Sequence, residues 1–137
     1  RRLWEHRIPV IVHVILGLPG ETNEQILETI SYVGHLPIFG IKLQLLHVLS
    51  DTSLGALYQK EPFPLFSQDE YCELVCDCLE RLPQTITIHR LTGDGPKDLL
   101  MAPLWSRAKR SVLNQIQKTL ETRDTWQGKY YSPTSIP

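Results

Sequence analysis

The most constraining feature of the sequence is an apolar run that does not alternate with polar residues, IPVIVHVIL at positions 8–16. The run is rich in β-branched residues, has His13 as its one polar side chain, and is closed by the turn residues Gly17–Gly20. A strand with this pattern is typical of a parallel sheet that is covered on both faces. The run therefore predicts a buried parallel strand whose neighbours are reached through crossover helices.

Helical and strand patterns alternate after this first strand. Thr22 with Gln25, and Ser67 with Glu70, have the spacing of capping boxes, which predicts a helix after each threonine or serine. Two more strands and a long third helix are expected at 41–49, 85–91 and 104–122. The order β-α-β-α-β-α predicts the α/β class, with a parallel sheet and helices outside it. Three such units make either half of a six-unit barrel or a small open sheet, and in both cases ligands bind at the carboxyl ends of the strands.

The size and cysteine content narrow the class of protein. A chain of 137 residues has the size of one domain and can bury a core. It has no apolar run as long as the 18 or so residues of a membrane span, and three cysteines are an odd number for a secreted disulfide framework. We therefore expect a cytoplasmic protein that does not enter a membrane. Because the chain starts at Arg1, without methionine and just before a strand, we expect it to begin inside a larger domain.

All three cysteines lie in one segment, CELVCDC at positions 72–78, which has the density of a metal or iron–sulfur ligand set. The capping box at Ser67 places this segment in a helix, where successive residues are about 100° apart. Cys78 then falls in the predicted buried stripe, and Cys72 and Cys76 lie on its flank. Roughly 160° separates Cys76 from Cys78, whereas thiolates that bind one metal must converge. We interpret the cysteines as packing residues.

Polar residues near the strand ends are candidates for binding. His13, His47 and His89 lie on three different predicted strands, where they are either metal ligands or hydrogen-bonded core residues. The segment HRLTGDGPKD at 89–98 is either a ligand-binding turn, with Asp94 accepting from ribose hydroxyls, or a tight turn that needs glycine. GLPGET at 17–22 can likewise place a carboxylate or phosphate at a helix N-terminus.

Charge is divided unevenly along the chain. Residues 1–96 hold 7 Lys and Arg against 12 Asp and Glu, whereas residues 97–137 hold 7 against 3. The basic C-terminal third fits either a nucleic-acid partner or an ordinary solvated helix surface.

Several longer motifs resemble one family. HVILGLPGETNEQ, GIKLQLLHVLSDTSLGALY, IHRLTGDGPKDLLMAPLW and RDTWQGKYY are similar to the C-terminal half of a bacterial radical S-adenosylmethionine (radical SAM) subfamily. That subfamily is related to the Elongator catalytic subunit and to oxygen-independent coproporphyrinogen oxidase. The resemblance covers nearly all of residues 1–131. It departs from the family pattern at Asp51, where glycine is frequent before Thr52, although Asp tolerates a left-handed backbone.

The resemblance implies residues 1–124 as the second half of a (β/α)6 radical-SAM barrel, a TIM-like partial barrel, followed by a tail at 125–137. Family members bind a [4Fe–4S] cluster through a Cys-x3-Cys-x2-Cys loop and cleave S-adenosylmethionine to a 5′-deoxyadenosyl radical. This chain lacks that loop, because its own spacing is Cys-x3-Cys-x-Cys, so we expect it to be inactive alone. The cofactor-binding candidates that carry over are His13, Gly17, Lys42, Gln44, Arg90 and Asp94. The implied substrate is a tRNA wobble uridine.

Two rival functions follow from the residues themselves. One is a metal-dependent hydrolase of the TIM-barrel type that uses the three strand histidines. The other is a non-catalytic module that binds nucleic acid through its C-terminal third. A half barrel also leaves the strand at 8–16 with an unpaired apolar edge, for which we expect self-association.

Overall fold

The computed structural model describes residues 5–93 and 95–133. Its sheet has three strands in the order β1-β2-β4, all parallel, and each strand leads to a helix that returns the chain. The three consecutive β/α units of the predicted α/β fold are thereby confirmed. The elements are β1 (Ile11–Leu16), α2 (Asn23–Gly34), β2 (Gly40–Leu45), β3 (Val48–Leu49), α3 (Ser53–Lys60), α4 (Gln68–Glu80), β4 (Thr87–Arg90), η1 (Lys97–Leu99), β5 (Leu100–Ala102), η2 (Leu104–Arg107) and α5 (Lys109–Arg123).

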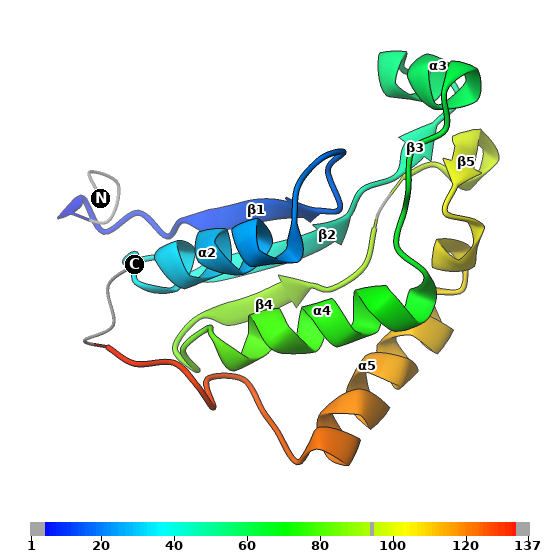
Figure 1. Ribbon diagram of the computed structural model, residues 1–137. Helices are drawn as coiled ribbons and strands as arrows, with labels where there is room; N and C mark the ends of the chain where they lie inside the picture. Colours follow the sequence, from blue (N-terminus) through cyan, green and yellow to red (C-terminus); the bar gives the residue numbers. More distant parts are fainter. Residues whose placement is uncertain (1–4, 94, 134–137) are drawn as a thin grey trace.

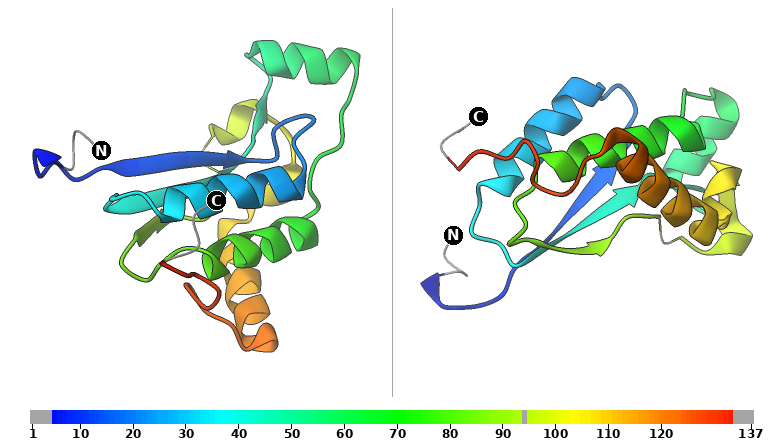
Figure 2. Two further views of the ribbon diagram at one scale, coloured as in Figure 1. Left: turned by 60° about the vertical axis from the view of Figure 1, so that its left-hand side comes forward. Right: turned by 90° about the horizontal axis from the view of Figure 1, so that it is seen from below.

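Helices α2 and α4 lie side by side on one face of the sheet, and α5 lies against α4 (Figures 1 and 2). The core fills the space between these layers. Its largest fully buried side chains include Leu16, Ile30, Ile41 and Tyr71. No helix in the described residues is long and apolar enough to cross a membrane.

Both predicted capping boxes are present. The Thr22 hydroxyl accepts from the Gln25 backbone N–H, and the Gln25 side chain accepts from the Thr22 N–H. Ser67 and Glu70 form the same reciprocal pair at the start of α4. Each box satisfies backbone donors that the first helical turn leaves free, so local sequence alone determines where these two helices begin.

The second predicted strand, at 41–49, is wrong in its length. The sheet strand β2 ends at Leu45, and Val48–Leu49 turns away as β3 to pair antiparallel with β5. This small second sheet carries α3 beyond the carboxyl ends of the main strands (Figure 1). The predicted helix at 104–122 is also corrected, because Leu104–Arg107 forms a 3-10 turn and α5 begins at Lys109.

The expectation that the first strand is covered on both faces is wrong for this chain. Strand β1 begins at Ile11, and its side chains alternate between a buried set facing the helices and an exposed set. Ile11 and Ile15 are 40% and 44% exposed. No described element covers that side of the sheet (Figure 2). We call it the open face, defined by Ile11, His13, Ile15, Lys42, Gln44, Thr87 and His89.

The segment after α5 packs on α4 and on the loop that follows α4. The Thr125 hydroxyl donates to Glu80, and the Gln127 side chain donates to the carbonyls of Pro83 and Ile86. The backbone N–H groups of Gly128 and Tyr130 donate to Leu79 and Glu80. These contacts hold residues 125–130 at the amino-terminal end of the sheet, away from the strand ends where a ligand is expected.

Candidate functional site at the strand ends

The sheet register brings three of the sequence-predicted residues into one row. His13 pairs with Lys42 across β1 and β2, and Lys42 pairs with Arg90 across β2 and β4. Adjacent strands lie about 4.8 Å apart, so paired residues are neighbours. His13 is exposed and Lys42 and Arg90 are half-buried. The register therefore places a histidine, a lysine and an arginine at neighbouring backbone positions of three adjacent strands.

The residues on both sides of this row are a mixture of polar and apolar side chains. Gln44 pairs with Ile15 one step nearer the carboxyl ends of the strands. Ile11, Gly40 and Thr87 occupy the step below. Within residues 5–93 and 95–133, Lys42 forms no ion pair. An anionic group of a ligand would complement a row of this composition.

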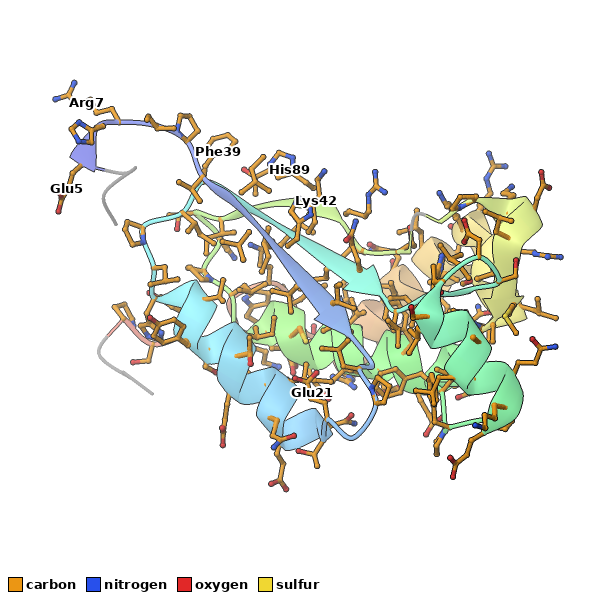
Figure 3. All side chains as sticks on the ribbon, turned by 90° about the horizontal axis from the view of Figure 1, so that it is seen from above. Glu5, Arg7, Glu21, Phe39, Lys42 and His89 are labelled. Atoms are coloured by element: carbon orange, nitrogen blue, oxygen red, sulfur yellow. The ribbon has the colours of Figure 1, made fainter. Side chains whose placement is uncertain are left out.

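His89 extends the open face, with a geometry that depends on a glycine. A register shift between Ile41 and Lys42 leaves His89 between the paired residues Ile88 and Arg90. Its ring lies over Gly40, where a Cβ would be 2.4 Å from the ring, and it also contacts Phe39 with ring centroids 5.9 Å apart. Figure 3 shows Phe39, His89 and Lys42 on the side of the sheet away from the helices. Sequence reasoning missed Phe39 and Gly40, although glycine inside a strand is a known sign of close approach.

Gly17 lies at the carboxyl end of β1, but it faces the helical layer. Its φ is +97°, and a Cβ would lie 3.1 Å from the Phe66 ring. Both observations call for glycine. The turn Gly17–Glu21 and the segment Phe63–Phe66 enclose a cavity of about 390 Å³. At the start of α2, however, the Thr22 hydroxyl already accepts from one of the free N–H groups that an anion would use.

The three strand histidines are not brought together. His13 and His89 are on the open face, whereas His47 packs against Gly93 and Gly95 in the turn after β4. Among the residues that the structure describes, no three His, Cys, Asp or Glu side chains are placed to hold a metal ion. Asp94, the remaining cofactor-binding candidate, lies outside the described residues.

The cysteines are packing residues, but they are more deeply buried than helix angles predicted. All three are buried, Cys72 and Cys76 included, because α5 covers the flank of α4. The Cys72 and Cys76 thiols donate to the carbonyls of Val112 and Ile116, at 3.8 and 3.7 Å. Burial is the main cause that raises the pKa of Cys72 to about 11 and of Cys76 to about 12. Protonated thiols that donate to separate carbonyls do not fit an iron–sulfur cluster.

Comparisons with known proteins show which family and which proteins this chain is similar to. Residues 38–122 match the model of the Radical_SAM C-terminal domain. The protein YtqA of Bacillus subtilis is 44% identical over 130 residues, which are 95% of this chain and 40% of that protein. A protein of Methanocaldococcus jannaschii is 35% identical over 122 residues, 88% of this chain and 38% of its own length. The chain thus spans about two fifths of these relatives.

A solved structure supports the fold independently of sequence similarity. The archaeal Elp3 of Methanocaldococcus infernus, with an N-terminal deletion, superposes with a TM-score of 0.75 at 16% identity. The match covers 91% of this chain and 29% of that one. From the family model, which covers more than half of the chain, we conclude that the chain belongs to the radical SAM family as its C-terminal domain.

Proposed function

We propose that residues 1–124 form the second half of a radical-SAM barrel and that the open face lines the interior of that barrel. The observation that carries the proposal is the row His13–Lys42–Arg90, of which His13 and Lys42 lie on a sheet face that no described element covers. In this proposal S-adenosylmethionine binds along the open face, near the carboxyl ends of β1, β2 and β4. The whole protein is then an enzyme, of which this chain supplies part of the cofactor site.

The residues of the open face fit the polar parts of S-adenosylmethionine. The carboxylate of its methionine portion matches the cationic row, with Lys42 and Arg90 as donors. The Gln44 amide can both donate and accept, which suits ribose hydroxyls or an adenine edge. The apolar side chains Ile11 and Ile15 suit the flat faces of the adenine ring. With a reduced [4Fe–4S] cluster beside it, S-adenosylmethionine bound there would supply the radical chemistry that removes hydrogen from a substrate.

The cluster ligands are proposed to come from outside the residues described here. The thiols of α4 are all buried, and those of Cys72 and Cys76 donate to helix α5, so the described part of the chain holds no set that fits a cluster. The expected contribution of this chain is to bind and orient S-adenosylmethionine and to exclude water from the reacting atoms. By itself it should not cleave S-adenosylmethionine.

We extend the proposal to a tRNA substrate because of the basic surface near the strand ends. Lys97, Arg107 and Arg110 are exposed between the end of β4 and the first turn of α5. Asp98 is the one acidic residue from Lys97 to Arg110. Arg123 does not contribute to this surface, because it is paired with the acidic side of α4. A phosphate backbone that contacts the three exposed cations would bind in a salt-dependent manner.

The test uses the chain lengthened at its N-terminus to the span of its relatives and purified without oxygen. We expect about four irons per chain after reconstitution and release of 5′-deoxyadenosine on reduction. Lys42→Met should weaken S-adenosylmethionine binding about tenfold or more, because it removes a charge-assisted hydrogen bond. The matched control, Lys60→Met at the exposed end of α3, should leave binding unchanged.

The outcomes separate the proposal from its rivals. A lengthened chain that binds no cluster and yields no 5′-deoxyadenosine would refute the radical-SAM assignment of activity. Salt-dependent binding of tRNA by the present chain, without any effect of the cluster, would instead favour a nucleic-acid-binding module. If Lys42→Met and Lys60→Met weaken S-adenosylmethionine binding equally, the loss results from the change in net charge and not from a specific contact of Lys42.

The exposed edge of β1 leads to a prediction about association. In the described residues β1 pairs with β2 alone, and its other edge presents backbone donors and acceptors beside exposed isoleucines. Such an edge is a template for pairing with another chain. We expect the 137-residue chain to self-associate in sedimentation velocity as its concentration rises, and Ile15→Lys to suppress the association. A chain that stays monomeric at millimolar concentration would contradict this prediction.

A further inference from the structure

The segment after β4 is contacted by a histidine that follows β2, the neighbouring strand of the sheet. The Gly95 backbone N–H donates to Nδ1 of His47, with the two nitrogens 3.2 Å apart. A Cβ on Gly93 would lie 2.0 Å from Nε2 of the same ring, and a Cβ on Gly95 would lie 2.8 Å from Nδ1. The imidazole thus occupies the space that side chains at both positions would need. Glycine at 93 and 95 is therefore explained by the His47 ring.

The hydrogen bond defines the chemical form of the ring. A backbone N–H can only donate, so Nδ1 of His47 must be the unprotonated, accepting nitrogen. The neutral ring then carries its proton on Nε2, which lies against Gly93. A ring in this state cannot also give Nδ1 to a metal, so the contact argues against His47 as a ligand through that atom.

This contact matters because the sheet no longer holds the chain at this point. The last residue of β4 paired with β2 is Arg90, opposite Lys42, although β2 itself continues to Leu45. Beyond Arg90, the hydroxyl of Tyr71, a residue of helix α4, donates to the Leu91 carbonyl. The two oxygen atoms are 2.7 Å apart. His47, which follows the end of β2, makes the corresponding contact to Gly95. The Tyr71 and His47 side chains therefore contact the chain just after β4 ends, next to the row His13–Lys42–Arg90.

We propose that His47 is a positioning residue that fixes Gly93 and Gly95, and with them the Arg90 end of β4, relative to Lys42 on β2. It touches no ligand in this role. The ligand part of the inference rests on the proposed function, in which Arg90 and Lys42 hold S-adenosylmethionine. The structural part, a turn held by a neutral imidazole, stands on the contacts of His47 alone.

Two substitutions separate the hydrogen bond from the packing. His47→Asn keeps an acceptor, because the Asn side-chain oxygen can take the place of Nδ1. His47→Leu fills a similar volume without any acceptor. The first measurement is amide hydrogen exchange of the 137-residue chain, followed by mass spectrometry. The second is the affinity of the lengthened chain for S-adenosylmethionine, determined by calorimetry.

The expected results differ between the two variants. In His47→Leu, exchange in the peptide that contains Gly95 should accelerate about tenfold, while peptides from α2 and α4 stay unchanged. Affinity for S-adenosylmethionine should fall about tenfold in the same variant. His47→Asn should stay within about threefold of the wild type in both measurements.

Each other result overturns a stated part of the inference. Unchanged exchange at Gly95 in His47→Leu would overturn the turn-holding role. Faster exchange throughout α2 and α4 would show that His47 supports the whole fold and positions nothing in particular. Local loosening with unchanged affinity would overturn the link to the ligand. If the wild-type lengthened chain binds no S-adenosylmethionine while the exchange results hold, the proposed function fails and the role of His47 in the turn is supported.

Discussion

Replacing Arg123 with methionine is expected to lower the free energy of unfolding by about 3 kcal/mol. The Arg123 guanidinium lies between α5 and α4, where it donates to Asp77 at 2.8 Å and also pairs with Glu73. Burial lowers its pKa, but the hydrogen bonds to Glu73 and Asp77 raise it further, so the cation is retained. The largest cost of the substitution comes from Glu80, which is 6% exposed and lies 3.6 Å from Arg123. Without the guanidinium, the Glu80 carboxylate retains only the hydrogen bond from the Thr125 hydroxyl and the longer ion pair with Arg81, among the interactions described here.

The stability measurement is urea unfolding of the wild type and of three variants. Lys118→Met, which removes an exposed cation from the same helix, should change stability by less than about 0.5 kcal/mol. Glu80→Gln combined with Arg123→Met should be more stable than Arg123→Met alone, because the uncompensated charge is gone. If Arg123→Met and Lys118→Met have equal effects, the ion pairs between α4 and α5 are surface pairs of little value.

Local patterns predicted the framework of the fold because each depends on a few adjacent residues. Thr22 with Gln25, and Ser67 with Glu70, determine two helix starts through contacts three residues apart. The order of strands and helices then gives a parallel sheet, since right-handed crossovers leave few alternatives. The same order put His13, Lys42 and Arg90 on three strands, but only the register shows that they form one row.

What the sequence did not predict depends on contacts between distant residues. Val48 and Leu49 continue the apolar pattern of β2, but their partners are Ala102 and Leu100, about fifty residues later. Cys72 and Cys76 were placed on a helix flank because periodicity describes α4 alone and contains nothing about α5. The glycines of the turn after β4 looked like either a ligand contact or a tight turn. The spacing of residues in the sequence does not predict that His47 packs against these glycines.

Raising the pH from 8 to about 11 is expected to destabilise the protein by several kcal/mol, through the thiols of α4. Burial, the largest cause in each case, raises the pKa of Cys72 to about 11 and those of Cys76 and Cys78 to about 12, from an ordinary value of 9.0. Burial also raises the pKa of Tyr71. In the unfolded chain these groups lose their protons near their ordinary values, so the unfolded state is favoured as pH rises. Their contribution is fully present below about pH 9 and is lost progressively toward pH 12.

The thiols can be separated from every other group that titrates in this range. Each thiol that ionises only in the unfolded chain contributes a slope of about 1.4 kcal/mol per pH unit. The variant with Cys72, Cys76 and Cys78 all changed to alanine will be less stable at pH 8, because it loses buried volume. Its stability should nevertheless fall less steeply than that of the wild type between pH 9 and 11. Parallel slopes would mean that the thiols ionise as readily in the folded protein, which would contradict their burial and reopen them as candidate ligands.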